Sequence, residues 1–230
     1  AGSTGTILYP APNAAGLLVA ILTHSLLVNG TRESERKARQ TASDQALLPY
    51  QGAIDRLNFD QLALDVQSRL ISANTQPATP PRVVYLQPHF RVATDHRVIV
   101  LDTGVRVQDA EAARQVRFDG VVQVVSPPRE GDEPLTKWLD NDAQLFRDAL
   151  ATMLSHAVDI ALRIGKTTTT EPARTQRYVF GNEVRMERGQ PLATGCGRVV
   201  LWTLRESWMS VPISPSEPAT CIDRYQVAQP

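Results

Sequence analysis

The stretch VIVLDTGVRV, residues 98–107, places two apolar runs on either side of Asp102-Thr103-Gly104. Its Val, Ile and Leu residues favour a β-strand. Residues 82–89 and 118–126 have the same strand-like composition, and the ATDH sequence at 93–96 fits a hairpin turn between the first two strands. We therefore predict three consecutive strands, with a bend or bulge at Asp102-Thr103-Gly104 in the middle one.

The residues before these strands have the 3.6-residue periodicity of helices instead. Leu62, Val66 and Leu70 recur at four-residue spacing, behind a capping residue at Asn58 or Asp60. This pattern predicts a helix with one apolar face.

A proline-rich linker, QPATPP at 76–81, separates the helical residues from the strands, because neither a helix nor a central strand accepts so many prolines. We therefore expect a helical N-terminal region over residues 1–76 and an α+β domain over residues 82–230. One continuous domain is the alternative.

A long helix is predicted from a cap at Asp140 or Asn141 to about residue 164, with an apolar stripe able to lie across a sheet. Strand-like residues return in the hairpins at 177–186 and 198–213. The predicted fold class is α+β: an N-terminal helical segment followed by a mainly antiparallel sheet packed with one long helix.

The Asp102-Thr103-Gly104 motif resembles the catalytic loop of aspartic proteases, in which two carboxylates share one proton. The sequence contains the motif once, and Val105 stands where retropepsin-like enzymes have Ala or Ser. The leading prediction is therefore a protein without catalytic residues, and a hydrolase using acidic residues around Asp102 stays the alternative.

Metal and cofactor sites have little support in the sequence. His89 and His96 lie near Asp95 and Asp102, which would allow at most a weak metal site. The glycine-rich phosphate-binding and zinc-protease motifs are absent from the sequence. We predict no metal and no cofactor.

The charge pattern argues against a nucleic-acid partner. Lys plus Arg and Asp plus Glu each number 24, so the formal net charge is zero. The most basic run, RESERKAR at 32–39, is interleaved with Glu33 and Glu35, whereas nucleic-acid binders carry a basic stripe. Hydrophobic residues at 42% and charged residues at 21% indicate a folded chain.

The two cysteines, Cys196 and Cys221, lie in the turn-like sequences TGCGR and ATCID, with 24 residues between them. A disulfide across a loop of this size stabilises a fold by about 3 kcal/mol in the chain-entropy picture. Two unrelated buried thiols are the alternative. We predict the disulfide, which indicates an oxidising compartment.

Residues 14–28 form the most apolar segment, shorter than the roughly 20 residues that span a bilayer. We expect a buried helix. The alternative is a helix that docks on a partner or a membrane surface through Leu17, Leu18, Ile21 and Leu22.

The first residues, AGSTGT at 1–6, are small and polar, like the tether that follows the lipid-bearing cysteine of bacterial lipoproteins. With the cysteine pair and the helix-then-sheet layout, the chain resembles uncharacterised periplasmic lipoproteins of Gram-negative bacteria. The resemblance implies a removed signal peptide, a lipid anchor upstream of Ala1, and a periplasmic location at the outer membrane.

The leading expectation for function is a non-enzymatic cell-envelope component. It would act through an envelope protein partner or through self-association of its N-terminal helices. Besides the hydrolase, the sequence leaves open a small-ligand binding module with a pocket between helix and sheet.

Overall fold

The structure is a computed structural model, which describes residues 41, 45–73, 82–110, 115–164, 170–214 and 226–227. The apolar segment 14–28 and the linker 76–81 lie outside the described residues. The domain boundary expected at this linker therefore stays a prediction.

The described strands form one sheet with the order β1-β2-β3-β7-β6-β5-β4, and β8 pairs with β5. The strands are β1 (Arg82–Val92), β2 (Ile99–Asp109), β3 (Val116–Val125), β4 (Arg174–Phe180), β5 (Glu183–Gly195), β6 (Arg198–Thr203), β7 (Trp208–Pro212) and β8 (Gln226–Val227). Every described pair is antiparallel except β3 with β7. The parallel pair joins two antiparallel meanders, β1–β3 and β4–β7.

The motif Asp102-Thr103-Gly104 lies inside the regular part of β2, so the predicted bend or bulge at these residues is wrong. All three residues pair in register with both β1 and β3. The irregularity in this ladder falls later, between Val107 and Gln108. The apolar runs on both sides of the motif therefore continue one strand, whose buried face includes Leu101 and Val105.

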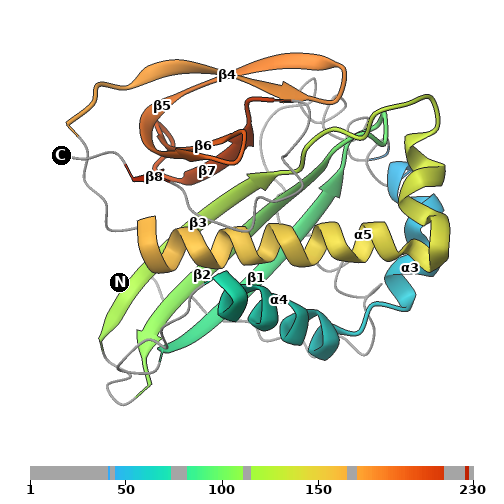
Figure 1. The fold of residues 1–230 in the computed structure, drawn as a ribbon, viewed down its shortest axis with the longest axis horizontal. Coiled ribbons are helices and arrows are strands. Elements are labelled where there is room, and N and C mark those ends of the chain that lie inside the picture. The colour runs from blue at the N-terminus through green and yellow to red at the C-terminus, as the bar shows by residue number, and fades with distance from the viewer. Residues whose placement is uncertain are drawn as a thin grey trace, which may run out of the picture.

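Helices cover one face of β1–β3 (Figure 1). The longest of the described helices is α5 (Pro134–Asp159), which continues as a π-helical turn, η3 (Ile160–Ile164), and lies across the three strands. Beside α5 lies α4 (Phe59–Ala73), preceded by the short helices η2 (Leu48–Tyr50) and α3 (Gln51–Asp55). The α+β class, with a mainly antiparallel sheet and one long helix, is confirmed.

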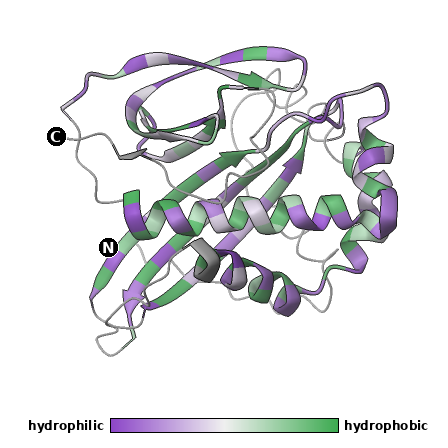
Figure 2. Cartoon of the chain, in the orientation of Figure 1, coloured by the Kyte–Doolittle hydropathy of each residue, from purple (hydrophilic) through white to green (hydrophobic). Residues whose placement is uncertain are grey.

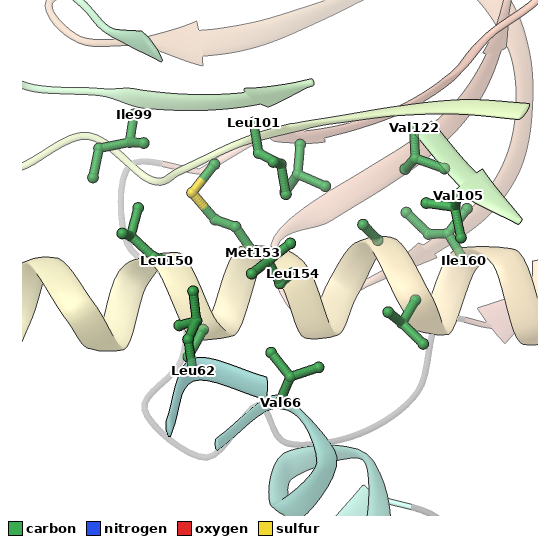
Figure 3. Close-up of a cluster of buried hydrophobic side chains, with 14 of the residues drawn as sticks. Leu62, Val66, Ile99, Leu101, Val105, Val122, Leu150, Met153, Leu154 and Ile160 are labelled. Carbon is green, nitrogen blue, oxygen red and sulfur yellow. The ribbon is translucent and has the colours of Figure 1, made fainter. Parts of the chain in front are cut away.

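The helix α4 begins as the sequence predicts. The Asn58 Oδ1 accepts hydrogen bonds from the backbone N–H groups of Asp60 (2.9 Å) and Gln61 (3.1 Å), so Asn58 is the capping residue. Leu62 and Val66 are buried against the main core, which places the predicted apolar face toward α5 (Figure 3).

The long helix was predicted to begin at Asp140 or Asn141, whereas α5 begins at Pro134. Asn141, Asp142 and Ala143 have φ values of 50°, 55° and 57°, so the helix is interrupted by a left-handed segment at the predicted cap. The regular helix that crosses the sheet starts after this segment. The predicted start was therefore wrong for α5 as a whole but marks a change of direction within it (Figure 1).

The main core lies between the helices and the β1–β3 face, and its members include Ile99, Leu101, Leu150, Met153 and Leu154 (Figure 3). A second cluster lies on the other face, where β4–β7 curl over the ends of β2 and β3. Its buried members are Val98, Val100, Val125, Tyr178, Val199, Leu201, Met209 and Val211. Hydrophobic and hydrophilic residues alternate along β1–β3, as expected for strands with one covered face (Figure 2).

Candidate functional site

Asp102 lies on the face of β2 that points away from α5, and its carboxylate is held by a cation and an amide. Arg91 donates from Nε (3.0 Å) and Nη2 (2.5 Å) to Oδ2, and Gln123 Nε2 donates to Oδ1 at 2.5 Å. An aspartic protease needs a second carboxylate at this point to share a proton. The surroundings of Asp102 are those of a cross-strand ion pair, which gives the hydrolase alternative no support.

His89 and His96, considered above for a weak metal site, have different surroundings. His89 pairs with Asp102 across β1 and β2, and burial lowers its pKa although the Asp102 charge opposes that shift. The His96 ring lies 5.8 Å from the ring of Tyr50. Across the part of the chain that the structure describes, no three His, Cys, Asp or Glu side chains gather into a group that could hold a metal ion.

The candidate site is a cavity of about 520 Å³ between α5 and the segment 126–130 that follows β3. Its apolar lining comes from Pro127, Pro128, Trp138, Leu145, Ala149 and Met153. Its polar lining comes from Ser126, Arg129, Glu130, Lys137, Asp148, Thr152, His156 and Arg198. From Leu145 to His156 the cavity follows α5 for about 16 Å, at 1.5 Å per helical residue.

Hydrogen bonds of the backbone and of two side chains hold the segment 126–130 against the turn between β1 and β2 and the start of β2. The Arg129 N–H donates to the Arg97 carbonyl at 2.8 Å, and Arg97 Nη1 donates to the Arg129 carbonyl at 2.8 Å. Ser126 Oγ accepts from the Ile99 N–H at 2.9 Å. Pro127 and Pro128 add fixed φ angles between these anchors. The wall of the cavity opposite α5 is thus built into the fold.

One end of the cavity is formed by Arg129 and Trp138. The Trp138 ring is buried, and its Nε1 donates to the His96 carbonyl at 2.7 Å. The Arg129 guanidinium carbon lies 4.4 Å from the centre of this ring, which is a cation–π contact. Burial lowers the pKa of Arg129, and its buried Nε–H has no acceptor among the described residues.

The other end of the cavity is formed by His156 and Arg198. The Arg198 side chain is buried and donates from Nη2 to the Val125 carbonyl (2.6 Å) and from Nε to Ser210 Oγ (3.0 Å). Burial, and to a smaller extent the charges of Arg198 and Arg69, lower the pKa of His156 to about 3. His156 is therefore neutral near pH 7 and, with so low a pKa, is a poor general base.

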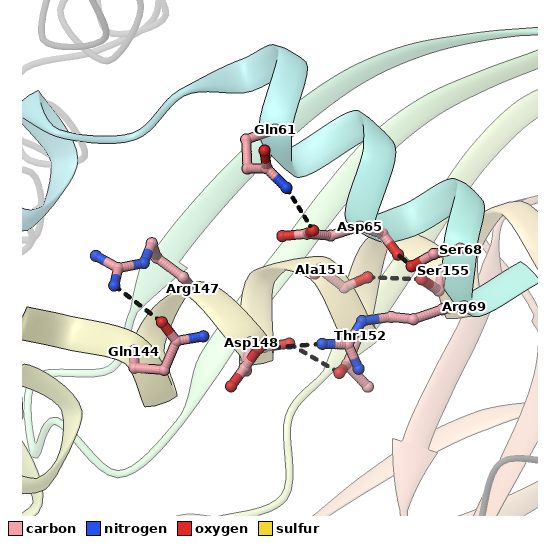
Figure 4. A network of polar contacts seen from close by, with 10 residues as sticks. All are labelled: Gln61, Asp65, Ser68, Arg69, Gln144, Arg147, Asp148, Ala151, Thr152 and Ser155. Carbon is pink, nitrogen blue, oxygen red and sulfur yellow. Dashed lines mark hydrogen bonds and ion pairs between the residues drawn. The ribbon is translucent and has the colours of Figure 1, made fainter. Parts of the chain in front are cut away.

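Between the two ends, α4 and α5 are joined at the edge of the cavity by an ion pair (Figure 4). Arg69 Nη2 lies 3.1 Å from Asp148 Oδ1, and Thr152 Oγ1 donates to the Asp148 carbonyl at 2.8 Å. The Asp148 carboxylate thus already has a cationic partner. The other carboxylate of the lining belongs to Glu130, which is an exposed residue.

The lining charges favour the binding of an anion over catalysis. Three basic side chains, Arg129, Lys137 and Arg198, line the cavity together with two carboxylates, and one of these carboxylates is paired with Arg69. The two lining hydroxyls donate to backbone carbonyls, Ser126 to Pro127 and Thr152 to Asp148. Neither hydroxyl is therefore poised as a nucleophile, which would need an adjacent base.

The predicted docking residues and one cysteine of the predicted disulfide lie outside the residues that the structure describes. Leu17, Leu18, Ile21 and Leu22, the predicted docking residues, lie outside the described residues, as does Cys221. Cys196 lies in the turn between β5 and β6 and is disulfide-bonded. The pairing of Cys196 with Cys221 stays a prediction.

The helices of the described segments include none that combines the length and the apolarity needed to cross a membrane.

The residues that line the cavity were not predicted from the sequence as a site. Arg129 belongs to SPPREGDEP, which the sequence indicates as a proline turn, and Arg198 opens the strand-like sequence RVVLWTL. A signal was nonetheless present, since an arginine at the head of an apolar strand needs partners when it is buried. His156 was considered only as a neighbour of Ser155.

Comparisons with protein-family models, with curated proteins and with solved structures found no match for this chain. Its function must therefore be inferred from its own residues.

Proposed function

We propose that the protein is a non-enzymatic binding module that holds a small ligand in the cavity between α5 and the segment 126–130. The observation that carries this proposal is the cavity itself, which combines an apolar lining with charged side chains. A volume of about 520 Å³ is within the range of small-molecule sites, roughly 300–1,000 Å³.

The chemistry of the lining supports a ligand-binding role over a packing defect. A cavity that arises only from imperfect packing is apolar. This cavity instead contains two arginines and a histidine beside its apolar lining, and burial lowers the pKa of Arg129 and of His156. Convergent polar groups around an apolar surface are the usual composition of a ligand site.

Ligand-observed NMR with four probes of similar shape tests the proposal: benzoate, phenyl phosphate, benzyl alcohol and benzylamine. Ala149 lines the cavity, so Ala149→Trp would place an indole within it. We expect at least one probe to bind the unmodified full-length chain and to lose its binding in Ala149→Trp.

Ala63→Trp is the matched control, because Ala63 is exposed on α4 and does not line the cavity. It should bind the probes as the unmodified chain does. Circular dichroism would verify that both variants are folded. If no probe binds, or if Ala149→Trp binds them equally well, the cavity is not a ligand site.

A second part of the proposal concerns location: the protein would be an exported component of the cell envelope that also contacts an envelope partner or a second copy of itself. The disulfide-bonded state of Cys196 favours it, because disulfides persist in oxidising compartments. Fractionation of cells that express the protein from its own gene tests the location. Recovery in the cytosol with reduced cysteines would contradict it.

The proposed contact through residues 14–28 has a separate test. Light scattering after size exclusion, and liposome flotation, would compare chains with and without residues 1–30. We expect removal of these residues to lower the oligomeric state or to abolish liposome binding. If neither property changes, the segment is not a docking element.

A further inference from the structure

The Arg129 guanidinium is a cation whose donors have no acceptor within the described protein. Its Nε–H is buried without a hydrogen-bond partner, and its terminal nitrogens make no hydrogen bond or ion pair with a described residue. Its observed contact is the cation–π contact with Trp138. Arginine keeps its charge at any physiological pH, so this charge is present while the donors are unused.

The position of Arg129 is fixed by the fold and is not that of a free surface side chain. Reciprocal hydrogen bonds with Arg97 hold its backbone, and the buried Trp138 ring supports the guanidinium from one side. A guanidinium fixed in this way needs little reorganisation to bind a carboxylate or a phosphate, both of which match its planar set of donors.

Lys137 adds a second cation at the same end of the cavity. Its Nζ donates to the Glu130 carbonyl at 2.6 Å, which uses one of its three donors. The Lys137 ammonium is hydrogen-bonded to the residue that follows Arg129, and the Arg129 guanidinium lies over the ring of the residue that follows Lys137, so both cations belong to the part of the lining formed by residues 129–130 and 137–138. The Glu130 carboxylate also lines the cavity but is on an exposed residue, where water screens its charge.

We propose that the ligand of the cavity is a small organic acid, whose carboxylate or phosphate group is bound by Arg129 and Lys137 and whose apolar part lies along α5. This inference rests on the ligand-binding function proposed above. Leu145, Ala149 and Met153 would contact the apolar part, since they are apolar residues that α5 contributes to the lining.

The four probes separate this inference from the function on which it rests, because they share an aromatic ring and differ in charge. Isothermal titration of the full chain should give benzoate and phenyl phosphate affinities at least about tenfold higher than that of benzyl alcohol, as expected for a hydrogen bond between charged groups. Benzylamine should bind most weakly. The stronger of the two acids would identify a carboxylate or a phosphate as the natural group.

Arg129→Gln should weaken the binding of the acids by about tenfold or more and leave benzyl alcohol unchanged. Arg129→Lys keeps the charge but not the planar fork of donors. Its affinity for the acids should therefore lie between that of the unmodified chain and that of Arg129→Gln. Arg205→Gln is the matched control, since the Arg205 side chain is 82% exposed and does not line the cavity; it should change none of the affinities.

Each other outcome has a definite meaning. If benzyl alcohol binds as tightly as the acids, or if Arg129→Gln does not weaken them, the organic-acid inference is wrong. Loss of binding in Ala149→Trp would then still support the cavity as a ligand site. If no probe binds the unmodified chain, both proposals are rejected.

Discussion

His156 lies on α5 close to two guanidinium groups, and this environment links its protonation to folding. Its pKa is lowered to about 3 by burial and by the charges of Arg198 and Arg69. The ordinary histidine pKa is about 6.5 in the unfolded chain. Between these two values the unfolded chain binds the proton and the folded chain does not, so stability falls as the pH falls through this range.

His156→Gln removes this titration and should flatten the pH dependence of stability. Between about pH 6.5 and pH 4, the free energy of unfolding of the unmodified chain should decrease more steeply than that of the variant, by up to about 1.4 kcal/mol per pH unit. Urea denaturation at several pH values measures both slopes. Parallel curves for the two proteins would show that His156 is not held neutral by the fold.

His89→Gln is the comparison for that experiment. The pKa of His89 is also lowered by burial, but the opposing charge of Asp102 limits the effect. Its replacement should therefore change the slope less than His156→Gln does.

Gly181 closes the β4–β5 hairpin against the turn between β1 and β2. Its φ of 62° is one that residues with a side chain rarely adopt, and an added Cβ would lie 2.4 Å from the Asp95 carboxylate. Gly181→Ala should therefore lower the free energy of unfolding by about 1–3 kcal/mol, measured by chemical denaturation.

Gly52→Ala is the matched control for Gly181. Gly52 lies in α3, and an added Cβ would meet no atom within 4 Å. The replacement should leave stability unchanged or raise it by up to about 1 kcal/mol, because Ala favours helix. Equal effects of the two substitutions would contradict the close contact at Gly181.

At the scale of elements, the parallel contact between β3 and β7 joins the two meanders. Here Gly120 leaves room for the Trp208 ring, which lies 4.5 Å from the ring of Phe118 and 4.4 Å from that of Trp202. A Cβ at Gly120 would lie 2.4 Å from the Trp208 ring. The packing of Trp208 between β3 and β7 therefore depends on the absence of a side chain at Gly120.

Gly120→Ala should destabilise the protein by about 1–3 kcal/mol, because overpacking displaces the indole. The change should also appear in the tryptophan fluorescence of the folded state. Gly104→Ala serves as the control in β2, where an added Cβ would lie 3.5 Å from the flexible Gln87 side chain. A well-tolerated Gly120→Ala would mean that Trp208 packs elsewhere.

Local signals in the sequence predicted most of these elements and failed where the signal is not local. The cap at Asn58 and the apolar face of α4 follow from residues close in sequence, and both were predicted correctly. The start of α5 was not, because Asn141 and Asp142 are ordinary capping residues but here adopt left-handed backbone angles. Residue propensity alone cannot distinguish a cap that starts a helix from a left-handed segment that interrupts one.

At the scale of the whole molecule, the strand order and the cavity could not be predicted from the sequence. The parallel contact of β7 with β3 joins residues 86 positions apart, such as Val122 and Trp208. The cavity likewise combines segment 126–130, the middle of α5 and Arg198. Each of these segments has an ordinary local interpretation, and the charges converge only after the sheet has formed.

The disulfide predicted between Cys196 and Cys221 would secure the C-terminal residues to the β5–β6 turn. Cys196 is disulfide-bonded, so its thiol should not react with iodoacetamide until the protein is reduced. Reduction should lower the free energy of unfolding by about 3 kcal/mol. Peptide mapping without reduction should recover the two cysteines in one linked peptide, and full alkylation of unreduced protein would contradict the bridge.

The most direct test of the cavity as an organic-acid site is a titration of the ¹⁵N-labelled chain with benzoate, followed through the indole N–H signals. The three tryptophans give three such signals, and Trp138 is the one that lines the cavity. We predict that the Trp138 signal shifts in a saturable manner while those of Trp202 and Trp208 stay in place, and that Arg129→Gln raises the benzoate concentration at the midpoint of the shift by about tenfold or more. A Trp138 signal that does not move at saturating benzoate, or that has the same midpoint in Arg129→Gln as in the unmodified chain, would contradict the proposed site.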